Sequence, residues 1–403
     1  MKLDVRGWIV GGLLLLLAAA PAPSQSRYLF TWAMETKETA YADPMSREPQ
    51  GMGRDFLAVF DIAPDSSDFG RLVAMLPVGS GAQMAHHTNY EMPIDGILFA
   101  SDYKSGNSFV FNLSDPLHPR LTSTFSNAGT YTHAHSFVRL ANGNTLATFQ
   151  YNGPREREAV GALVELDPNG KVVRSSDASD PSVEAFIRPY SLQVVAKLDR
   201  VVTGSDEMPP ATGNSHVIQV WRLSDLKLLK SIVLPKAPHS DVVPQNAAEP
   251  RVLADGQTVV VASSACGLYR INDLGGSNPS AQWIYDFGAR TCGVPTVVGN
   301  YWVEAITSAH AVMSLDMRDS ANPVEAGRIA FKGIAFPHWI SHEPGGNRIA
   351  ITGYGWLSTH IFLATIDPNT GALALDARNI DFDRKWPDGW SGTAMPHGTV
   401  FSN

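Results

Sequence analysis

Short apolar runs alternate with clusters of glycine, proline, asparagine and aspartate along most of the chain, and helical periodicity is nearly absent. Typical runs are "FLAVFDIAP", "SFVFNLSDP", "TLATFQYNG", "ALVELDPNG", "VIQVWRLSD", "TVVVASS", "AVMSLDMRD" and "IFLATIDPNTG". Runs of this length that are bounded by turn-forming residues are typical of antiparallel strands. The pattern therefore predicts an all-β protein.

These strands form a repeat with a period of about 45 to 60 residues, close to the length of a four-stranded propeller blade. Each unit begins where a loop leads into its first strand; the beginnings are His87, His135, Tyr190, Pro250, Val294 and His338, and His397 returns to the first unit. Six full units and one assembled from both ends of the chain predict a seven-bladed β-propeller closed by its N- and C-terminal strands. Closure leaves no long strand edge exposed. A pair of β-sandwiches is the alternative, but it does not explain this register.

Histidines occupy several of these starting positions, although the chain has only 12. In a propeller, the loops that lead into the innermost strands lie at one mouth of the central channel, so their residues converge on the axis. Neutral imidazoles that converge in this way suit a late first-row transition metal. We predict a metal site among His86, His87, His133, His135, His338 and His397. The remaining histidines are expected to be structural or on the surface; they include His118, His216, His239, His310, His342 and His360.

Other side chains are expected on the same face of the propeller. The acids expected there, Asp102, Asp206, Glu207 and Glu249, could orient the ligand histidines, although aspartate is also common in turns. Cys266 and Cys292 are predicted to lie close enough for a disulfide; paired thiolates as copper ligands are the alternative. The chain lacks the motifs of serine hydrolases, phosphate-binding loops, H-E-x-x-H metalloproteases and covalent haem attachment. Any chemistry is therefore expected to be metal chemistry.

The first residues have the features of a secretory signal. Lys2 and Arg6 precede an apolar run, which is followed by "PAPSQS", and the run is shorter than the roughly 20 residues of a membrane span. We predict a signal peptide over 1–26, a single propeller domain over 27–403, and a periplasmic or secreted protein with no stable membrane insertion after cleavage. An uncleaved anchor is the alternative. The net charge of −8 and the pI of about 5.8 argue against nucleic acid or anionic lipid as a partner.

The chain resembles the selenium-binding protein family, which includes the methanethiol oxidases, from about Phe56 to the C-terminus. The segments that carry the resemblance are "AHHTNY", "THAHSFVRLANGNTLATF" followed by "GALVELDPNGKVV", "PYSLQVVAKLDRVVTGSDE", "FPHWISHEPGGNRIAITGYG" and "AMPHGTVF". The chain departs from the family in two places. It lacks the cysteine-bearing N-terminal segment associated with selenium binding, so that property is not carried over, and its loop "PREREA" is charged where the family has glycines. The resemblance is that of a distant member.

This resemblance implies a propeller with a copper centre that oxidises methanethiol with O2 to formaldehyde, hydrogen sulfide and hydrogen peroxide. The ligands that it implies are His86, His87, His135 and His397. A copper-bound thiol would lose its proton readily, and Tyr103 and Glu207 are the candidates for moving protons nearby. The expected partners are therefore a small thiol and O2, while no protein partner is indicated.

Two other classes of function stay open at this stage. A non-haem iron oxygenase is one, because carotenoid-cleaving enzymes are also seven-bladed propellers with four axial histidines. A non-catalytic exported interaction module is the other, because the hairpins "NLSDPLHPRL" and "MRDSANPVEAG" resemble the LVIVD repeats of surface proteins. Bound metal separates the enzymes from the interaction module, and the identity of the metal separates copper from iron.

Overall fold

The computed structural model describes residues 1, 26–36, 53–79, 84–154, 160–183, 187–206, 215–236, 246–332, 335–353, 358–387 and 391–403. The predicted signal peptide lies outside these residues except for its first and last positions, so its existence stays a prediction. Among the described residues, no helix has the length and apolar character needed to cross a membrane. The described helices are two short 3-10 turns, η2 (Ala196–Leu198) and η3 (Thr307–Ala309).

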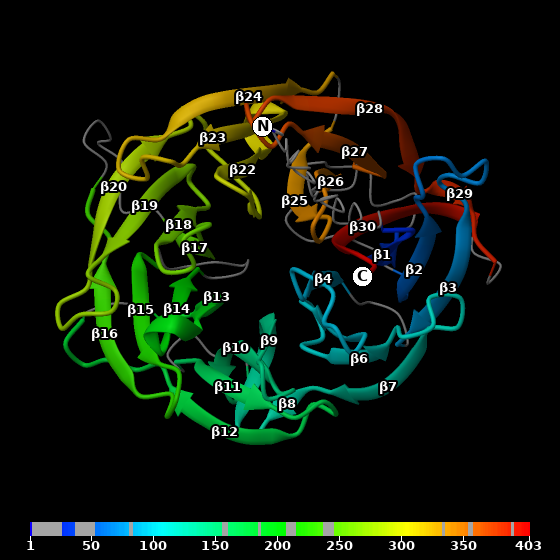
Figure 1. Ribbon diagram of the computed structural model, residues 1–403. Helices are drawn as coiled ribbons and strands as arrows, with labels where there is room; N and C mark the ends of the chain where they lie inside the picture. Colours follow the sequence, from blue (N-terminus) through cyan, green and yellow to red (C-terminus); the bar gives the residue numbers. More distant parts are fainter. Residues whose placement is uncertain are drawn as a thin grey trace.

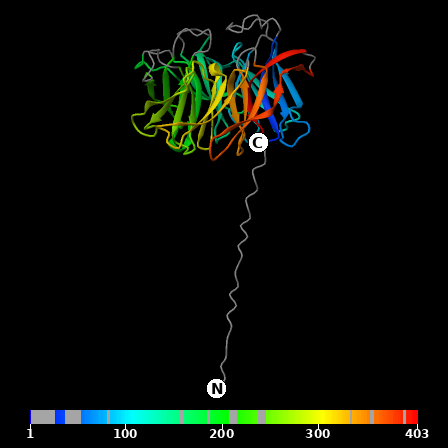
Figure 2. The same ribbon diagram turned by 90° about the horizontal axis from the view of Figure 1, so that it is seen from above.

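The strands are arranged in a ring around a central axis, and from the side the ring is a flat disc (Figures 1 and 2). The first three strand groups along the chain are β1 (Tyr28–Glu35), β2 (Asp55–Asp61) and β3 (Leu72–Val78); β4 (Ala85–Thr88), β5 (Ile97–Asp102), β6 (Ser108–Asn112) and β7 (Arg120–Phe125); and β8 (Asn127–Ala128), β9 (Tyr131–Arg139), β10 (Thr145–Asn152), β11 (Ala162–Leu166) and β12 (Val172–Asp177).

The second half of the ring continues in the same way. Its strands are β13 (Pro189–Val195), β14 (Arg200–Ser205), β15 (Val217–Arg222) and β16 (Leu228–Val233); β17 (Ala247–Val252), β18 (Val259–Ser263), β19 (Gly267–Asn272) and β20 (Ser280–Asp286); β21 (Thr296–Val298), β22 (Tyr301–Ile306), β23 (Ala311–Asp316) and β24 (Val324–Ala330); β25 (Pro337–His342), β26 (Arg348–Gly353), β27 (His360–Ile366) and β28 (Leu373–Asp381); and β29 (Asp383–Lys385) with β30 (Ser391–Phe401).

The predicted all-β propeller architecture is confirmed. The described strands form six hydrogen-bonded antiparallel sheets. The largest consists of two four-stranded halves, β13–β16 and β17–β20, that are joined through the single pair Ser205↔Ala247. The predicted number of seven blades therefore depends on counting these halves separately.

The chain ends close the ring as predicted. Strand β30 pairs antiparallel with β1, and Leu29 lies opposite Phe401 and Phe30 opposite Val400 in this ladder. The resulting sheet has the order β29-β30-β1-β2-β3, so its strands come from both ends of the chain. In Figure 1 the red C-terminal strand accordingly lies beside the blue N-terminal one. Closure consequently sets the position of His397, which lies on β30.

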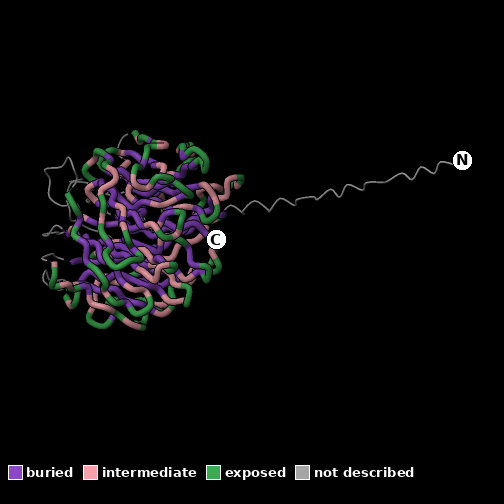
Figure 3. The backbone as a smooth tube through the Cα atoms, turned by 60° about the vertical axis from the view of Figure 1, so that its left-hand side comes forward, coloured by how far each residue is buried: buried purple, intermediate pink, exposed green. Residues whose placement is uncertain are grey.

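Burial explains why the strands have such different sequences. Inner and middle strands such as β2 and β18 are buried along their whole length, because neighbouring sheets cover both faces. These strands read as continuous apolar runs. Outer strands such as β7 and β12 are largely exposed and carry polar residues. Figure 3 shows the same gradient from a buried interior to an exposed periphery.

Candidate metal centre

A β-bulge recurs in the innermost strands and places the candidate ligands. In β4, Ala85 pairs with Asp102 and Thr88 with Ala100, so His86 and His87 together lie opposite Ser101. A regular strand would direct adjacent side chains to opposite faces, whereas a bulge places two residues opposite one and redirects them. Both adjacent histidines can therefore face the same site.

Equivalent shifts occur in other inner strands. At each shift, the inner strand has one residue more than the strand that it pairs with. The residues at these bulges are His135 and Ser136 in β9, Tyr190 and Ser191 in β13, Ala248 in β17, His338 in β25, and His397 and Gly398 in β30. By this register His86 corresponds to His135, and His87 corresponds to Ser136. Our sequence alignment, which paired His87 with His135, was displaced by one residue here because a bulge cannot be seen in a strand pattern.

Three of the predicted ligands form a compact group. The ligand atoms of His86, His87 and His135 lie within 4.8 Å of one another. The Nε2 atoms of His86 and His135 are 3.0 Å apart, and the ring centroids of His87 and His135 are 4.1 Å apart. All three side chains are buried. They come from two neighbouring sheets, so the tertiary fold assembles the group.

Two more histidines adjoin this group. The His397 ring centroid lies 4.5 Å from that of His86 and 5.7 Å from that of His87. The His338 ring lies 4.9 Å from the His397 ring. The structure thus brings together five of the six predicted candidates around the axis.

The ring nitrogens of this cluster fit a metal ion. The buried His87 Nε2, His86 Nδ1 and both ring nitrogens of His397 have no hydrogen-bond partner among the described residues. Buried polar atoms are normally satisfied, and a metal ion bound in this cluster would satisfy these nitrogens. His135 is held in one tautomer, because its Nδ1 must donate a hydrogen bond to the Tyr190 carbonyl oxygen at 2.9 Å. Its Nε2 therefore carries a lone pair toward the cluster.

Burial keeps these imidazoles neutral. Desolvation lowers the pKa of His135 to about 3 and the pKa of His338 to about 4. The pKa values of His86, His87 and His397 are also well below the ordinary value, first through burial and then through the neighbouring histidines. Neutral imidazole is the metal-binding form. The cluster is consequently ready to bind a metal at neutral pH.

His133 does not belong to the three-histidine group. Its backbone has a φ of 57°, in the left-handed region that non-glycine residues seldom adopt. The regular alternation that would place His133 and His135 on one face is broken there. The ring packs 5.1 Å from that of Tyr151, and its Nδ1 lies 3.1 Å from Thr132 Oγ1. The structure thus offers no support for His133 as a ligand beside the others.

Of the two residues predicted to move protons, Tyr103 and Glu207, the structure describes only Tyr103. Tyr103 is partly buried, and its ring centroid lies 5.8 Å from that of His86. Glu207 lies outside the described residues, so its position is not assigned. Asp102 contacts the strand instead of a histidine ring, because its Oδ1 accepts the Met84 N–H at 2.8 Å. It therefore fixes the start of β4, next to His86.

The two cysteines form a disulfide, Cys266–Cys292. Both residues are buried. The bond joins the turn between β18 and β19 to the segment that precedes β21, and so links two neighbouring four-stranded units. The alternative of paired thiols as copper ligands does not hold in this structure.

Sequence reasoning placed Glu249 on this face as a possible partner of the ligand histidines, but it missed the buried polar network to which Glu249 belongs. The Tyr90 hydroxyl contacts Ser136, Ser191 and Glu249, and the Arg251 guanidinium lies 3.9 Å from the Tyr90 ring centroid. Tyr90 and Arg251 also line a cavity of about 830 Å³. The one available signal was the serine that directly follows His135 and Tyr190 in their strands. Tyr90 and Arg251 carried no pattern that linked them to Glu249.

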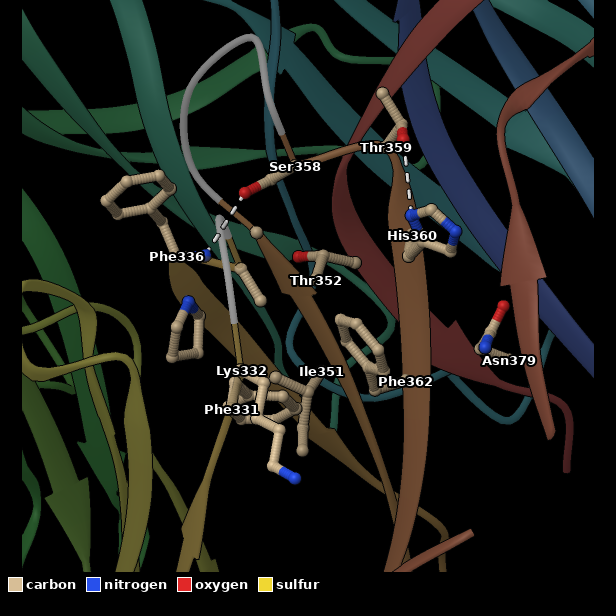
Figure 4. A pocket seen from close by; sticks show the side chains of 13 residues that line it. Phe331, Lys332, Phe336, Ile351, Thr352, Ser358, Thr359, His360, Phe362 and Asn379 are labelled. Carbon is tan, nitrogen blue, oxygen red and sulfur yellow. Dashed lines mark hydrogen bonds between the residues drawn. The ribbon is translucent and has the colours of Figure 1, made fainter. Parts of the chain in front are cut away.

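A smaller pocket lies among β24–β28 (Figure 4). It adjoins the cluster, because the lining residue Thr352 donates its hydroxyl to the His397 carbonyl oxygen at 2.7 Å. Its volume is about 250 Å³, and Phe331, Phe336 and Phe362 contribute aromatic rings to its wall. His360 lines it too, and its Nδ1 lies 3.2 Å from Thr359 Oγ1. None of the five clustered histidines lines this pocket.

A curated protein is similar to part of this chain. No family model matches the chain. It is 29% identical over 230 residues to a methanethiol oxidase from a Hyphomicrobium species, and the match covers 52% of each chain. The chain thus spans about half the length of the curated relative that it matches. This similarity fits a distant member of the selenium-binding protein family.

Solved structures show the same architecture. A hypothetical selenium-binding protein from Sulfolobus tokodaii superposes with a TM-score of 0.74 at 14% identity and covers 94% of both chains. A periplasmic gluconolactonase from Pseudomonas aeruginosa has a TM-score of 0.62 at 12% identity over 93% of this chain and 99% of its own. At such identities these likenesses show the fold alone. The link to the selenium-binding protein family therefore depends on the curated relative together with the histidine site.

Proposed function

We propose that this protein is an exported copper-dependent oxidase of small thiols, similar in chemistry to methanethiol oxidase. The observation that carries the proposal is the buried group His86, His87 and His135, with its unpartnered ring nitrogens. The relative's name adds the substrate class, a small thiol with O2. The net reaction would be methanethiol, O2 and water to formaldehyde, hydrogen sulfide and hydrogen peroxide, which balances in atoms and electrons.

The protein's own residues would hold the metal and exclude water from it. His86, His87 and His135 would be ligands, and His397 would be the fourth. Copper bound there would supply the redox chemistry between thiol and O2, since imidazole suits copper. The Tyr103 phenol is the described group that we assign to proton movement near His86. His338 adjoins His397 and would complete the wall of the site.

The first test is metal content. Protein exported to the periplasm and purified without chelators should contain near-stoichiometric copper and show nitrogen hyperfine structure in its electron paramagnetic resonance spectrum. His87→Ala and His397→Ala should each lose most of the copper and thiol-dependent hydrogen peroxide formation. His118→Ala is the matched control, because His118 is exposed and pairs with Asp115. This control should keep both properties.

The other outcomes decide between the remaining functions. Stoichiometric iron in place of copper would favour an oxygenase. No metal after reconstitution with copper would mean that the histidines are structural and that the propeller is a binding module. Full activity and metal content in His87→Ala would contradict the ligand assignment. Recovery of the protein in the cytoplasm, with residues 2–25 intact, would contradict export.

A further inference from the structure

A chain of hydrogen bonds runs from His87 to a buried carboxylate. His87 Nδ1 lies 3.1 Å from Ser136 Oγ. Ser136 Oγ lies 3.0 Å from the Tyr90 hydroxyl, and the Tyr90 hydroxyl donates to Glu249 Oε2 at 3.0 Å. Ser136 and Glu249 are buried. These residues come from three different sheets, so the chain of contacts exists only in the folded ring.

The end of this chain favours one direction for its bonds. Burial raises the pKa of Glu249, but the Arg251 guanidinium, 3.0 Å away, opposes this shift and favours a carboxylate that only accepts hydrogen bonds. The Tyr90 proton is therefore directed to Glu249, and the Tyr90 oxygen must accept. We take Ser136 to donate its proton to Tyr90, so that the Ser136 oxygen accepts from His87 Nδ1 and from His135 Nδ1, which also lies 3.1 Å away. In this arrangement His87 Nδ1 carries the hydrogen.

This direction matters because it leaves the other nitrogen of His87 free. With hydrogen on Nδ1, the lone pair is on Nε2, which is the unpartnered buried nitrogen of His87. His135, a second proposed ligand, is held in the same tautomer, because the Tyr190 carbonyl oxygen accepts the hydrogen on His135 Nδ1. Partners that fix the tautomer of a ligand histidine typically change metal affinity by about 10- to 100-fold.

The Tyr90 ring is itself held firmly in place. It stacks on Trp339 with a centroid distance of 5.2 Å and an interplanar angle of 11°. The Arg251 guanidinium lies 3.9 Å from its centroid, and Arg251 Nε donates to the Pro295 carbonyl oxygen at 3.1 Å. A Ser191 hydroxyl also contacts the Tyr90 oxygen, at 2.6 Å. The position of the Tyr90 hydroxyl is therefore set by several neighbours.

We propose that Tyr90 is a positioning residue of the metal centre, which transmits the polarity of the Glu249 carboxylate through Ser136 and so fixes the tautomer of His87 for binding through Nε2. The inference rests on the proposed function in one respect, because it takes His87 as a metal ligand. The tautomer itself is a property of the metal-free protein. It can therefore be tested whether or not copper is the native metal.

The decisive measurement is long-range nitrogen–proton NMR on metal-free protein with labelled histidine side chains. In the wild type, His87 should be the Nδ1–H tautomer. Tyr90→Phe removes the hydroxyl but keeps the ring, so His87 should become a mixture of tautomers. Tyr269→Phe is the matched control, because the Tyr269 hydroxyl donates to the Pro235 carbonyl oxygen away from the site. It should leave His87 unchanged.

Copper affinity, measured by competition with a chelator, provides the second readout. Tyr90→Phe should weaken copper binding by about 10- to 100-fold, in the range of lost outer partners, and Tyr269→Phe should not. Should Tyr90→Phe fail to fold, Ser136→Ala breaks the same chain and Ser136→Thr restores the hydroxyl. An Nε2–H tautomer for wild-type His87, or a tautomer that Tyr90→Phe and Ser136→Ala leave unchanged, would overturn the proposal. A wild type that binds no copper but shows the expected tautomers would refute only the proposed function.

Discussion

At the scale of single residues, the axial histidines combine burial with neutral charge. Their pKa values are depressed chiefly because the folded protein removes them from water. The same burial raises the pKa of Asp55, whose neighbours include the Asp102 carboxylate, and the pKa of Glu304. Burial therefore favours the uncharged forms of these histidines, of Asp55 and of Glu304, whereas the Arg251 guanidinium opposes the same effect at Glu249. The arrangement favours metal binding but makes the metal-free protein sensitive to acid.

This sensitivity predicts a pH window for stability. His135 has a pKa of about 3 when folded and about 6.5 when unfolded, so the unfolded state binds more protons between these values. The free energy of unfolding of the metal-free protein should thus fall as pH falls below about 6.5. One such histidine accounts for about 2 kcal/mol between pH 8 and pH 5.

Urea unfolding of metal-free wild type and His135→Gln at pH 8 and pH 5 checks this expectation. The difference between the two proteins isolates the contribution of His135, because both contain Asp55 and Glu304. The raised pKa values of these two carboxyl groups change the free energy of unfolding in the opposite direction: their contribution is lost as pH rises through the folded pKa. An equal pH dependence in both proteins would contradict the assignment to His135.

At the scale of elements, the recurring bulge of the inner strands places the candidate ligands at the axis. It lets β4 present two adjacent histidines, and it lets β9 present a histidine and the serine that orients its neighbours. Links between neighbouring units then hold these strands in register. Trp32 Nε1 donates to the Ser101 carbonyl oxygen at 2.9 Å, which places β1 against the strand that pairs with β4. The disulfide supplies a covalent link of the same kind elsewhere in the ring.

Removal of the disulfide should destabilise the protein without removing the metal site. Cys266 and Cys292 are separated by 26 positions in the sequence, and closing a loop of that size corresponds to about 3 kcal/mol in the chain-entropy description. The double variant Cys266→Ala with Cys292→Ala should therefore unfold at lower urea concentration. Its copper content should equal that of the wild type. Unchanged stability, with the wild type shown to be oxidised, would contradict this role.

At the scale of the whole molecule, the metal would hold the ring together. The proposed ligands lie on β4, β9 and β30, and β30 is the strand that closes the ring by pairing with β1. A metal that contacts these strands would bind the folded ring in preference to the unfolded chain. Binding would therefore stabilise the fold by mass action, by about 2.7 kcal/mol at a free concentration 100 times Kd.

Copper should accordingly raise the Tm of the metal-free protein by several degrees, and thermal denaturation with and without copper measures this. The His118→Ala control should show the same rise. His397→Ala should show a smaller one, because it removes the ligand that β30 contributes. A rise of equal size in His397→Ala would mean that this strand does not take part in binding.

The sequence by itself determined the all-β class, the repeat, the closure by both chain ends and the positions of the axial histidines. Each of these depends on local information, because turn residues and apolar runs define the strands, and repetition then brings equivalent positions such as His135, His338 and His397 to the same mouth of the ring.

Only the tertiary structure decided which residues actually meet. Bulges shift His86 into register with His135, and the left-handed backbone of His133 turns it from the group that its spacing predicted. The network behind His87 could not be inferred either, since Tyr90 and Glu249 are 159 residues apart in the sequence. The physical reason is common to these cases: local patterns set the faces of strands, whereas irregular backbone and contacts between distant strands set the final direction of each side chain.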